Sequence, residues 1–546
     1  MTDDLVSGNE LLAESLTQLG VERCFFLMGG PTVDAANGME KAGLQMVAVR
    51  HEQAAVMMAH ASARLTQRPG LAMACSGPGT ANLVTGVAHA FVDGAPVVVL
   101  GGSSPVAEYG TGSFQELDQL KLMEPITRSA VRIYHTRRIP ELVGRAFTRA
   151  LAPKPGPVYL DLPADVLYGR VSRADVAPLV PLDPDSLRPH ADPEAVARAA
   201  RLLAGAERPV VLCGSGAIWS RAAGVLGDWS EQTGAPVYTS PQARGLVPET
   251  GDFAFLEARS TAFREADLII VVGARANYMV SQLLPPRFSA DAKLVQIDIA
   301  AEEIATSRTV DVPLVGDAAA VLGQLLKAYA GLKPANRHES WVEYLRKVTE
   351  AKRAKAAGRK WTDGRPIHPV ALCQVIDEFL DQDAILCVDG QEILNYARQT
   401  IRTFVPGHRL NSGTFGTMGV GLPFGVGAKI TRPDTQVVVL HGDGSFGLNA
   451  MELDTAVRNN APLITVISNN GGWTATDRYK VGRELGYTRY DRMAEALGCH
   501  GEFVERLEDI RPALERAAAS GRPAVVNVIT DSTARAGTAQ FTKFET

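Results

Sequence analysis

HGDGSFGLNAME, residues 441–452, decides the fold together with the pair Asn469–Asn470 that follows it. The apolar run TQVVVL precedes Asp443 and predicts a strand, and a helix is expected from about Asn449. A second run, PLITVI, predicts the strand that delivers Asn470, which lies 27 residues after Asp443. Both strand tips are expected at the carboxyl edge of a parallel sheet, where open α/β sheets bind ligands. The sequence therefore predicts an α/β fold with a ligand site at this edge.

The residue types at the two strand tips favour a magnesium–diphosphate site. Asp443 and Asn470 supply two hard oxygen ligands, and a backbone carbonyl near Gly472 supplies a third. Two diphosphate oxygens and one water would complete the octahedron that magnesium prefers. Gly442 and Gly444 carry no side chain, so the backbone can approach phosphates closely. A lone Gly-Asp-Gly is usually a turn, and the spacing to Asn470 makes metal binding the stronger interpretation.

This pair of strand tips resembles the magnesium–diphosphate motif of thiamine-diphosphate-dependent enzymes, and the resemblance extends over nearly the whole chain. It implies three consecutive parallel-sheet α/β domains, in agreement with the alternation of helix-period stretches and short β-branched runs. The implied domains are a pyrimidine-binding domain at 1–171, a central nucleotide- or coenzyme A-binding-like domain at 192–330 and a diphosphate- and magnesium-binding domain at 366–530. A tail at 531–546 follows them and could act as a lid.

The resemblance also implies thiamine diphosphate and Mg²⁺ as cofactors, with a set of contacts to them. Glu52, in VRHEQAAVMMAHA, matches the glutamate that shares a proton with the aminopyrimidine ring, although in isolation it would be read as an acid at a helix start. Met418, in NSGTFGTMGVGLP, matches the residue that bends the cofactor into its reactive shape. The implied cofactor contacts are Glu52, Gly390, Gln391, Glu392, Gly416, Met418, Gly442, Gly444, Ser445 and Asn470, and the metal ligands are Asp443, Asn470 and Gly472.

In this family the glutamate and the magnesium of one active site belong to different subunits. The resemblance therefore implies a homodimer or homotetramer whose sites lie at the subunit interface.

Three stretches narrow the choice within the family. Residues 273–304 and 101–120 resemble the corresponding segments of 2-hydroxyacyl-CoA lyases and oxalyl-CoA decarboxylases, and residues 527–546 lack the Pro-rich ending that is typical of acetolactate synthases. The resemblance implies a lyase that cleaves the C1–C2 bond of a 2-hydroxyacyl-CoA into formyl-CoA and an aldehyde or ketone. The alternatives are a carboligase of the acetolactate synthase type, an oxalyl-CoA decarboxylase, and a non-catalytic binding protein on the same fold. The last would be expected to lack Glu52, Asp443 or Asn470.

Substrate contacts follow from the same resemblance. Gln115 matches the glutamine of the family's Phe-Gln-Glu segment and could hydrogen-bond the substrate oxygen as a catalytic residue, with Phe114 as an apolar wall. Arg275 and Asp298, at strand ends of the central domain, could hold the phosphate and ribose of coenzyme A, or could form surface salt bridges. Glu484 is a candidate base for the 2-hydroxyl group, or a surface glutamate paired with a neighbouring arginine.

In the tail, Arg535 and Lys543 could contact the thioester, or could be solvated charges.

Composition limits the remaining classes. The chain has 546 residues, of which 46% are hydrophobic and 21% charged, as in a globular protein of roughly three to four domains. Lys and Arg number 55 against 60 Asp and Glu, which argues against a nucleic-acid-binding protein. The acidic start and the absence of a long apolar run argue against a signal peptide and a membrane span. Six scattered cysteines predict buried, reduced thiols and a cytoplasmic location.

Overall fold

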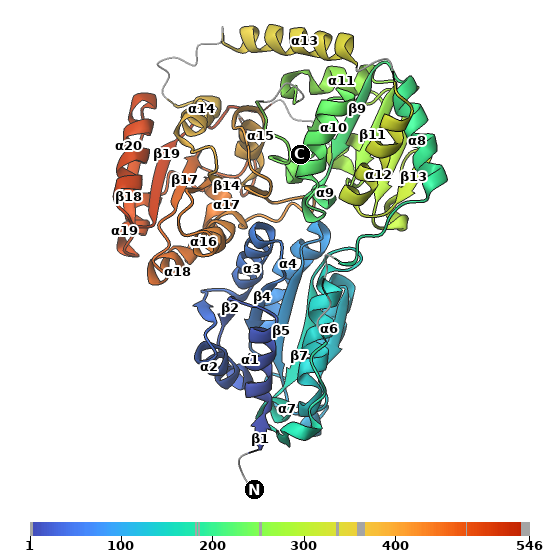
Figure 1. Cartoon of the computed structure of the whole chain (residues 1–546). Helices are drawn as coiled ribbons and strands as arrows, with labels where there is room; N and C mark the ends of the chain where they lie inside the picture. Colours follow the sequence, from blue (N-terminus) through green and yellow to red (C-terminus); the bar gives the residue numbers. More distant parts are fainter. Residues whose placement is uncertain are drawn as a thin grey trace.

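A computed structural model describes residues 4–180, 183, 186–250, 254–334, 338–357, 366–476 and 478–536. These residues form three parallel β-sheets, each with helices on its faces, which appear as the blue, green and orange units in Figure 1. A small antiparallel pair, β1 (Leu5–Ser7) and β8 (Arg170–Ser172), closes off the first unit. The predicted fold class, three parallel-sheet α/β domains, is confirmed.

The N-terminal sheet has the strand order β3-β2-β4-β5-β7-β6. Its strands β4, β5 and β7 are buried along their whole length because helices cover both faces. Ser7 caps α1 (Gly8–Gln18) through a capping box with Glu10. The strands are β2 (Arg23–Leu27), β3 (Gln45–Ala48), β4 (Gly70–Ala74), β5 (Val97–Ser103), β6 (Ser129–Arg132) and β7 (Val158–Pro163), and the other helices are α2 (Val33–Lys41), α3 (Glu52–Thr66), α4 (Pro78–Asp93), α5 (Gln119–Met123), α6 (Ile139–Leu151) and α7 (Ala164–Tyr168).

The central sheet has the order β10-β9-β11-β12-β13, so the chain leaves β9 for one neighbour and later returns to its other side. Such a switch point opens a crevice at the carboxyl ends of the strands. The strands are β9 (Pro209–Cys213), β10 (Val237–Thr239), β11 (Leu268–Val272), β12 (Lys293–Asp298) and β13 (Val312–Val315). The helices are α8 (Pro193–Gly205), α9 (Ser215–Trp219), α10 (Ala223–Thr233), α11 (Arg259–Glu265) and α12 (Ala318–Gly331), and α13 (Glu339–Ala357) packs on this unit through Trp341.

The C-terminal sheet has the order β15-β14-β16-β17-β19-β18. Its central strands β14, β16 and β17 lie side by side and end at the same edge. The residues that follow β16 and β17 therefore lie at one edge of the sheet, as predicted. The strands are β14 (Ile385–Asp389), β15 (Arg409–Asn411), β16 (Val437–Gly442), β17 (Ile464–Asn469), β18 (His500–Val504) and β19 (Ala524–Ile529). The helices are α14 (Pro369–Phe379), α15 (Gln391–Thr400), α16 (Gly421–Thr431), α17 (Asp443–Gly447), α18 (Glu452–Arg458), α19 (Tyr490–Ala496) and α20 (Leu507–Ala519).

The N- and C-terminal units share one hydrophobic core. Helix α3 lies against α16, and a Cβ atom added at Gly427 would lie 2.7 Å from the carbonyl oxygen of Met58. Phe424 packs edge-on against the imidazole rings of His60 and His89. The glycine therefore lets the two helices approach closely, which fixes the relative position of the two units.

One local prediction needs correction. The helix expected from about Asn449 begins at Glu452, after the short α17 that starts directly at Asp443. All six cysteines are buried and free, as predicted.

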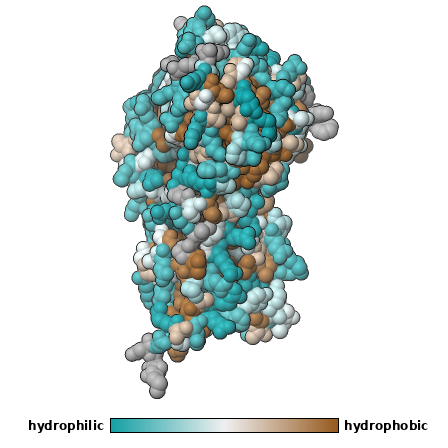
Figure 2. All heavy atoms as spheres, turned by 45° about the vertical axis from the view of Figure 1, so that its right-hand side comes forward, coloured by the Kyte–Doolittle hydropathy of each residue, from teal (hydrophilic) through white to brown (hydrophobic). Residues whose placement is uncertain are grey.

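Hydrophilic residues predominate on the face turned forward in Figure 2, with hydrophobic residues between them. Among the described residues, no helix combines the length and the apolar character needed to cross a membrane.

Candidate active site

A cavity lies at the carboxyl edge of the C-terminal sheet, where β14, β16 and β17 end in Asp389, Gly442 and Asn469. Most of the residues predicted to hold the cofactor line this one cavity. They are Gly390, Gln391, Glu392, Met418, Gly442, Asp443, Gly444, Ser445, Asn470 and Gly472.

The arrangement of Asp443, Asn470 and Gly472 fits a divalent cation. One terminal atom of the Asn470 amide lies 2.7 Å from the carbonyl oxygen of Gly472 and 3.2 Å from Oδ1 of Asp443. With its NH₂ group turned inward the amide would donate to both, and with its oxygen turned inward three oxygens lie side by side. Neighbouring ligands of an octahedral magnesium ion lie about 3.0 Å apart, given metal–oxygen distances of about 2.1 Å. The two distances from the Asn470 amide lie on either side of that value.

The burial of Asp443 also fits a bound cation. Asp443 is 2% exposed, and its Oδ2 atom is buried without a hydrogen-bond partner. Burial raises the pKa of this carboxyl group to about 6, despite hydrogen bonds from nearby backbone amides. A cation bound here would compensate the buried carboxylate.

The floor of the cavity is held by buried polar groups. The hydroxyl of Ser445 lies within 3.2 Å of the carbonyl oxygens of Asp389 and Gly442, and 3.0 Å from Nδ1 of His441. Gly390 has a φ of 115°, which favours glycine. The indole ring of Trp473 packs against Gly444, and a Cβ atom added to Gly444 would lie 2.6 Å from it. The backbone of this loop can therefore face a diphosphate without a side chain in between.

Glu52 lies in the N-terminal unit, at the first position of α3, and is 7% exposed. Asn82 donates a hydrogen bond of 3.0 Å to its Oε2 atom, and its Oε1 atom lies close to Gly79. The start of α3 is clamped from the C-terminal unit, because the carboxylate of Glu452 accepts the backbone N–H groups of Arg50 and His51, each at 3.1 Å. The Glu52 carboxylate is therefore buried and held by Asn82, at a helix start that the C-terminal unit fixes.

Several predicted residues lie outside the diphosphate cavity. Glu52 does not line it, and Gly416 has open space around its Cα atom. Gln115 lies beside Gly77 in the N-terminal unit, and the neighbouring Phe114 is 83% exposed. Within one chain, Glu52 and Gln115 therefore lie apart from the cavity that contains Asp443.

Glu484 has an exposed carboxylate, with 66% of its side chain accessible, and pairs with the guanidinium of Arg483 at 3.0 Å. The structure thus shows the pairing with a neighbouring arginine that was the alternative for Glu484. A role of Glu484 as the base for the 2-hydroxyl group stays a prediction. In the tail, Arg535 donates to Ala475 and Thr476 beside the metal loop, whereas Lys543 lies outside the described residues.

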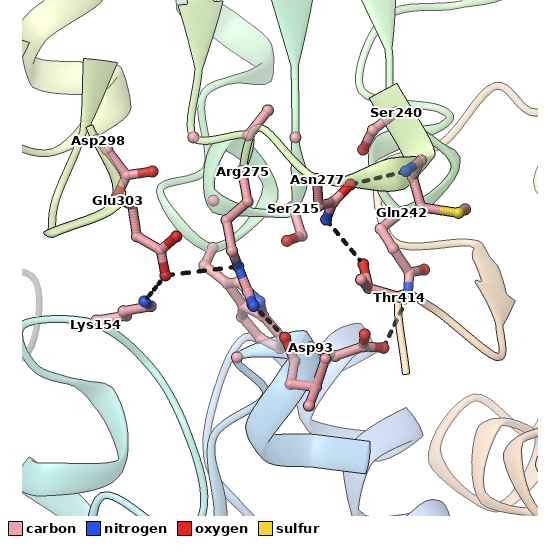
Figure 3. Close-up of a pocket in the computed structure, with 18 of the residues that line it drawn as sticks. Asp93, Lys154, Ser215, Ser240, Gln242, Arg275, Asn277, Asp298, Glu303 and Thr414 are labelled. Atoms are coloured by element: carbon pink, nitrogen blue, oxygen red, sulfur yellow. Dashed lines mark hydrogen bonds and ion pairs between the residues drawn. The ribbon is translucent and has the colours of Figure 1, made fainter. Parts of the chain in front are cut away.

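Arg275 and Asp298 meet in a pocket at the switch point of the central sheet (Figure 3). Arg275 points down toward the N-terminal unit, donates to the carbonyl oxygen of Val92 and lies 3.9 Å from Glu303. Asp298 is buried, which raises its pKa, and its Oδ1 atom accepts the N–H of Ala300. Arg275 is thus already engaged by protein groups, which weakens its candidacy as a phosphate ligand.

The pocket in Figure 3 also borders the loop that leads to the diphosphate cavity. Thr414 lines the pocket, while Met418, four residues further on, lines the cavity. Asn277 and Tyr278 hold Thr414 with hydrogen bonds of 3.3 Å and 2.9 Å. One loop therefore connects the two sites.

Sequence reasoning missed an arginine cluster at the junction of the central and C-terminal units, formed by Arg244, Arg259, Arg287, Arg398 and Arg409. Burial and mutual repulsion lower the pKa of Arg259 and of Arg409 to about 9, and that of Arg398 to about 10. Buried guanidinium nitrogens of these three residues have no hydrogen-bond partner. The carboxylate of Glu249 pairs with Arg244 and partly offsets the lowering of the pKa of Arg409, while neighbouring arginines further lower the pKa values of Arg259 and Arg398.

The arginine cluster adjoins the pocket in Figure 3, because Arg287 contacts the carbonyl oxygen of Met279, a residue of the pocket wall. Uncompensated buried charge is costly, by several kcal/mol per ion. The cluster is therefore a site that an anion would stabilise. No spacing pattern marks it in the sequence, since its members come from segments as far apart as Arg244 and Arg409.

Known proteins resemble this chain over almost its whole length. Models for the N-terminal, central and C-terminal domains of thiamine pyrophosphate enzymes match residues 6–122, 196–325 and 392–528. The chain is 34% identical to the acetolactate synthase large subunit IlvG of Mycobacterium tuberculosis, with 96% of each chain covered. It is 33% identical to a 2-hydroxyacyl-CoA lyase of Arabidopsis thaliana, covering 97% of this chain and 96% of that one. It is 31% identical to the oxalyl-CoA decarboxylase of Escherichia coli K12, covering 100% and 98%. The chain belongs to the thiamine pyrophosphate enzymes, and its cofactor is thiamine diphosphate.

Proposed function

We propose that this enzyme is a lyase that cleaves the C1–C2 bond of a 2-hydroxyacyl-CoA, releasing formyl-CoA and an aldehyde or ketone. The observation that carries the proposal is the arginine cluster, whose buried positive charge calls for an anionic ligand. Coenzyme A carries a diphosphate and a ribose phosphate, which guanidinium groups bind with paired hydrogen bonds. Two of the relatives are named for acyl-CoA substrates, and the third for acetolactate synthesis.

The position of the cluster suits a long substrate. A thioester whose nucleotide lay in the pocket in Figure 3, which the arginine cluster adjoins, would run along the loop from Thr414 to Met418. That loop ends at the diphosphate cavity, where the reacting carbonyl group would meet the cofactor. A small 2-oxo acid would leave the arginine cluster without a role in substrate binding.

The residues have distinct roles in this proposal. Asp443, Asn470 and the carbonyl oxygen of Gly472 would hold Mg²⁺ and, through it, the diphosphate. When bound, thiamine diphosphate supplies a carbon nucleophile and an electron sink for breaking the carbon–carbon bond. Glu52 would exchange a proton with the pyrimidine ring, in a buried pocket where that hydrogen bond gains strength. Gln115 would hydrogen-bond the substrate oxygen.

Atoms balance without a further reactant. The 2-hydroxyl group loses its proton and becomes the carbonyl group of the aldehyde or ketone. The carbon–carbon bond electrons pass to the thioester carbon, which gains one proton and leaves as the formyl group of formyl-CoA.

We also infer that two copies of the chain complete each active site. Glu52 does not line the cavity that contains Asp443, although both residues are buried and preorganised. A second copy would bring a pyrimidine pocket to each diphosphate cavity.

Incubation of the enzyme with thiamine diphosphate, Mg²⁺ and a panel of 2-hydroxyacyl-CoAs is expected to give formyl-CoA and the matching aldehyde or ketone, as detected by mass spectrometry. Parallel reactions contain pyruvate or oxalyl-CoA. Acetolactate from pyruvate, without formyl-CoA from any 2-hydroxyacyl-CoA, would identify a carboligase instead. Carbon dioxide release from oxalyl-CoA alone would identify a decarboxylase.

Replacement of Arg259 by methionine is expected to raise the KM for the acyl-CoA about 30-fold while changing kcat less than about threefold, because one charge-assisted contact to a phosphate is lost. Without ligand, the variant should unfold at the same or a higher temperature than wild type, since an unpaired buried charge has been removed. Steady-state kinetics and thermal unfolding measure the two effects.

The matched comparison uses the pantetheine thioester of the same acyl group, which lacks the nucleotide and its phosphates. On this truncated substrate R259M and wild type should have equal kcat/KM. Arg511→Met, a change at an exposed arginine of α20, controls for loss of charge alone. An equal defect of R259M on both thioesters would contradict the assignment of the arginine cluster to the nucleotide.

A further inference from the structure

We propose that Gln119 is a positioning residue that holds Gln115 in place for the substrate, acting through the backbone of Gly77. The inference rests on the proposed function in one respect, the contact between Gln115 and the substrate. Gln119 is the first residue of α5 and is 1% exposed, so it cannot touch the substrate itself.

Gln115 sits in an unfavourable backbone conformation that its neighbours must maintain. Its φ is +57°, in the left-handed region that non-glycine residues rarely adopt. Its Oε1 atom accepts a hydrogen bond of 2.8 Å from the hydroxyl of Ser76. Its carbonyl oxygen lies next to Gly77, because a Cβ atom added to Gly77 would be 2.4 Å from that oxygen. The turn formed by Ser76 and Gly77 therefore determines where Gln115 points.

Gln119 holds this turn through its amide group. Its Oε1 atom accepts the N–H of Gly77 at 2.6 Å. Its Nε2 atom lies 2.7 Å from Oδ1 of Asp161, 2.9 Å from the Tyr159 hydroxyl and 3.0 Å from the carbonyl oxygen of Gly102. Both ends of the amide are thus engaged, which fixes the side chain and with it the N–H of Gly77.

The network behind Gln119 is buried and charged, which makes it rigid. Asp161 is fully buried and accepts hydrogen bonds from Nε of Arg132 and from the Tyr159 hydroxyl. Burial, reinforced by the charge of Asp161, raises the pKa of Tyr159 well above its usual value, so the hydroxyl stays protonated. Several hydrogen bonds that converge on one buried carboxylate hold their donors in a fixed arrangement. Gln119 transmits that arrangement to the turn.

The site of Gln119 therefore needs both the oxygen of the amide as acceptor and its NH₂ group as donor. A methionine at this position would keep the volume and lose every hydrogen bond of the amide. A glutamate would keep the acceptor for Gly77 but place a second carboxylate beside Asp161.

The test is a double-mutant cycle of Gln119→Met and Gln115→Ala, measured as kcat/KM on the acyl-CoA or, should pyruvate prove to be the substrate, on pyruvate. Each single variant is expected to lose about 30-fold, and the double variant no more than about threefold beyond the worse single variant. The exchange of the C2 proton of bound thiamine diphosphate for deuterium, which requires no substrate, should stay within about threefold of wild type in every variant. If Q119M does not fold, Gln119→Glu takes its place in the cycle.

Gln324→Met is the control, because Gln324 exchanges two hydrogen bonds with the backbone of Ala191 in the central unit, far from the turn in sequence. It should leave kcat/KM unchanged. Multiplying losses in the cycle would overturn the inference, and so would a drop in C2 exchange as large as the drop in turnover. If no acyl-CoA reacts and pyruvate is turned over, the proposed function is wrong. The double-mutant cycle can then still be measured with pyruvate, so it tests the role of Gln119 separately.

Discussion

Replacement of Glu52 by glutamine is expected to slow turnover by about a thousandfold, because a glutamine cannot exchange a proton with the pyrimidine ring. The fold should survive, since Glu52→Gln keeps the shape of the side chain and a carbonyl oxygen that can accept the hydrogen bond of Asn82. Thiamine diphosphate should still bind, because its diphosphate end is held elsewhere. Single-turnover and steady-state kinetics at saturating cofactor measure the loss, and thermal unfolding checks the fold.

Glu10→Gln provides the matched control. Glu10 also lies in the first turn of a helix of the N-terminal unit, where its carboxylate accepts the N–H of Ser7 at 2.8 Å. The variant should lose up to about 1 kcal/mol of stability and none of its activity. Wild-type turnover by E52Q would remove Glu52 from the proton relay.

The diphosphate end of the site could be predicted from the sequence because it is local. Strands β16 and β17 are short apolar runs, and each delivers its ligand within one residue of its end, so the spacing between Asp443 and Asn470 carries the geometry. The same reasoning places Gly390 directly after β14. The register of neighbouring parallel strands then brings these residues to one edge without further information.

The arginine cluster and the surroundings of Glu52 could not be predicted in this way. Arg244, Arg259 and Arg409 come from three segments that only tertiary packing brings together, and each alone reads as a surface charge. The clamp of Glu452 on the start of α3 spans 401 residues of sequence. Such contacts depend on how two units dock, which periodicity and turn chemistry do not determine.

Asp443→Asn is expected to weaken the binding of Mg²⁺ at least about 100-fold, and that of thiamine diphosphate with it, because a neutral amide replaces the anionic oxygen that faces Asn470. Isothermal titration with the cofactor at several Mg²⁺ concentrations measures the loss, which excess Mg²⁺ should partly reverse. The apo protein should be no less stable than wild type, since a buried and unpaired carboxylate oxygen has lost its charge. Asp434→Asn, at an exposed turn, is the control.

Mixing the two inactive variants tests how the half-sites combine. If Glu52 and Asp443 of one active site come from different copies, a dimer of one E52Q chain and one D443N chain has one site with both changes and one site with neither. Random reassociation should then restore about a quarter of wild-type activity, because half of the dimers are mixed and each of these has one intact site. If both residues of a site came from the same chain, every site would carry a change and the mixture would stay inactive. Recovered activity would therefore locate the active site between two copies, with Glu52 from one copy and the Asp443 cavity from the other.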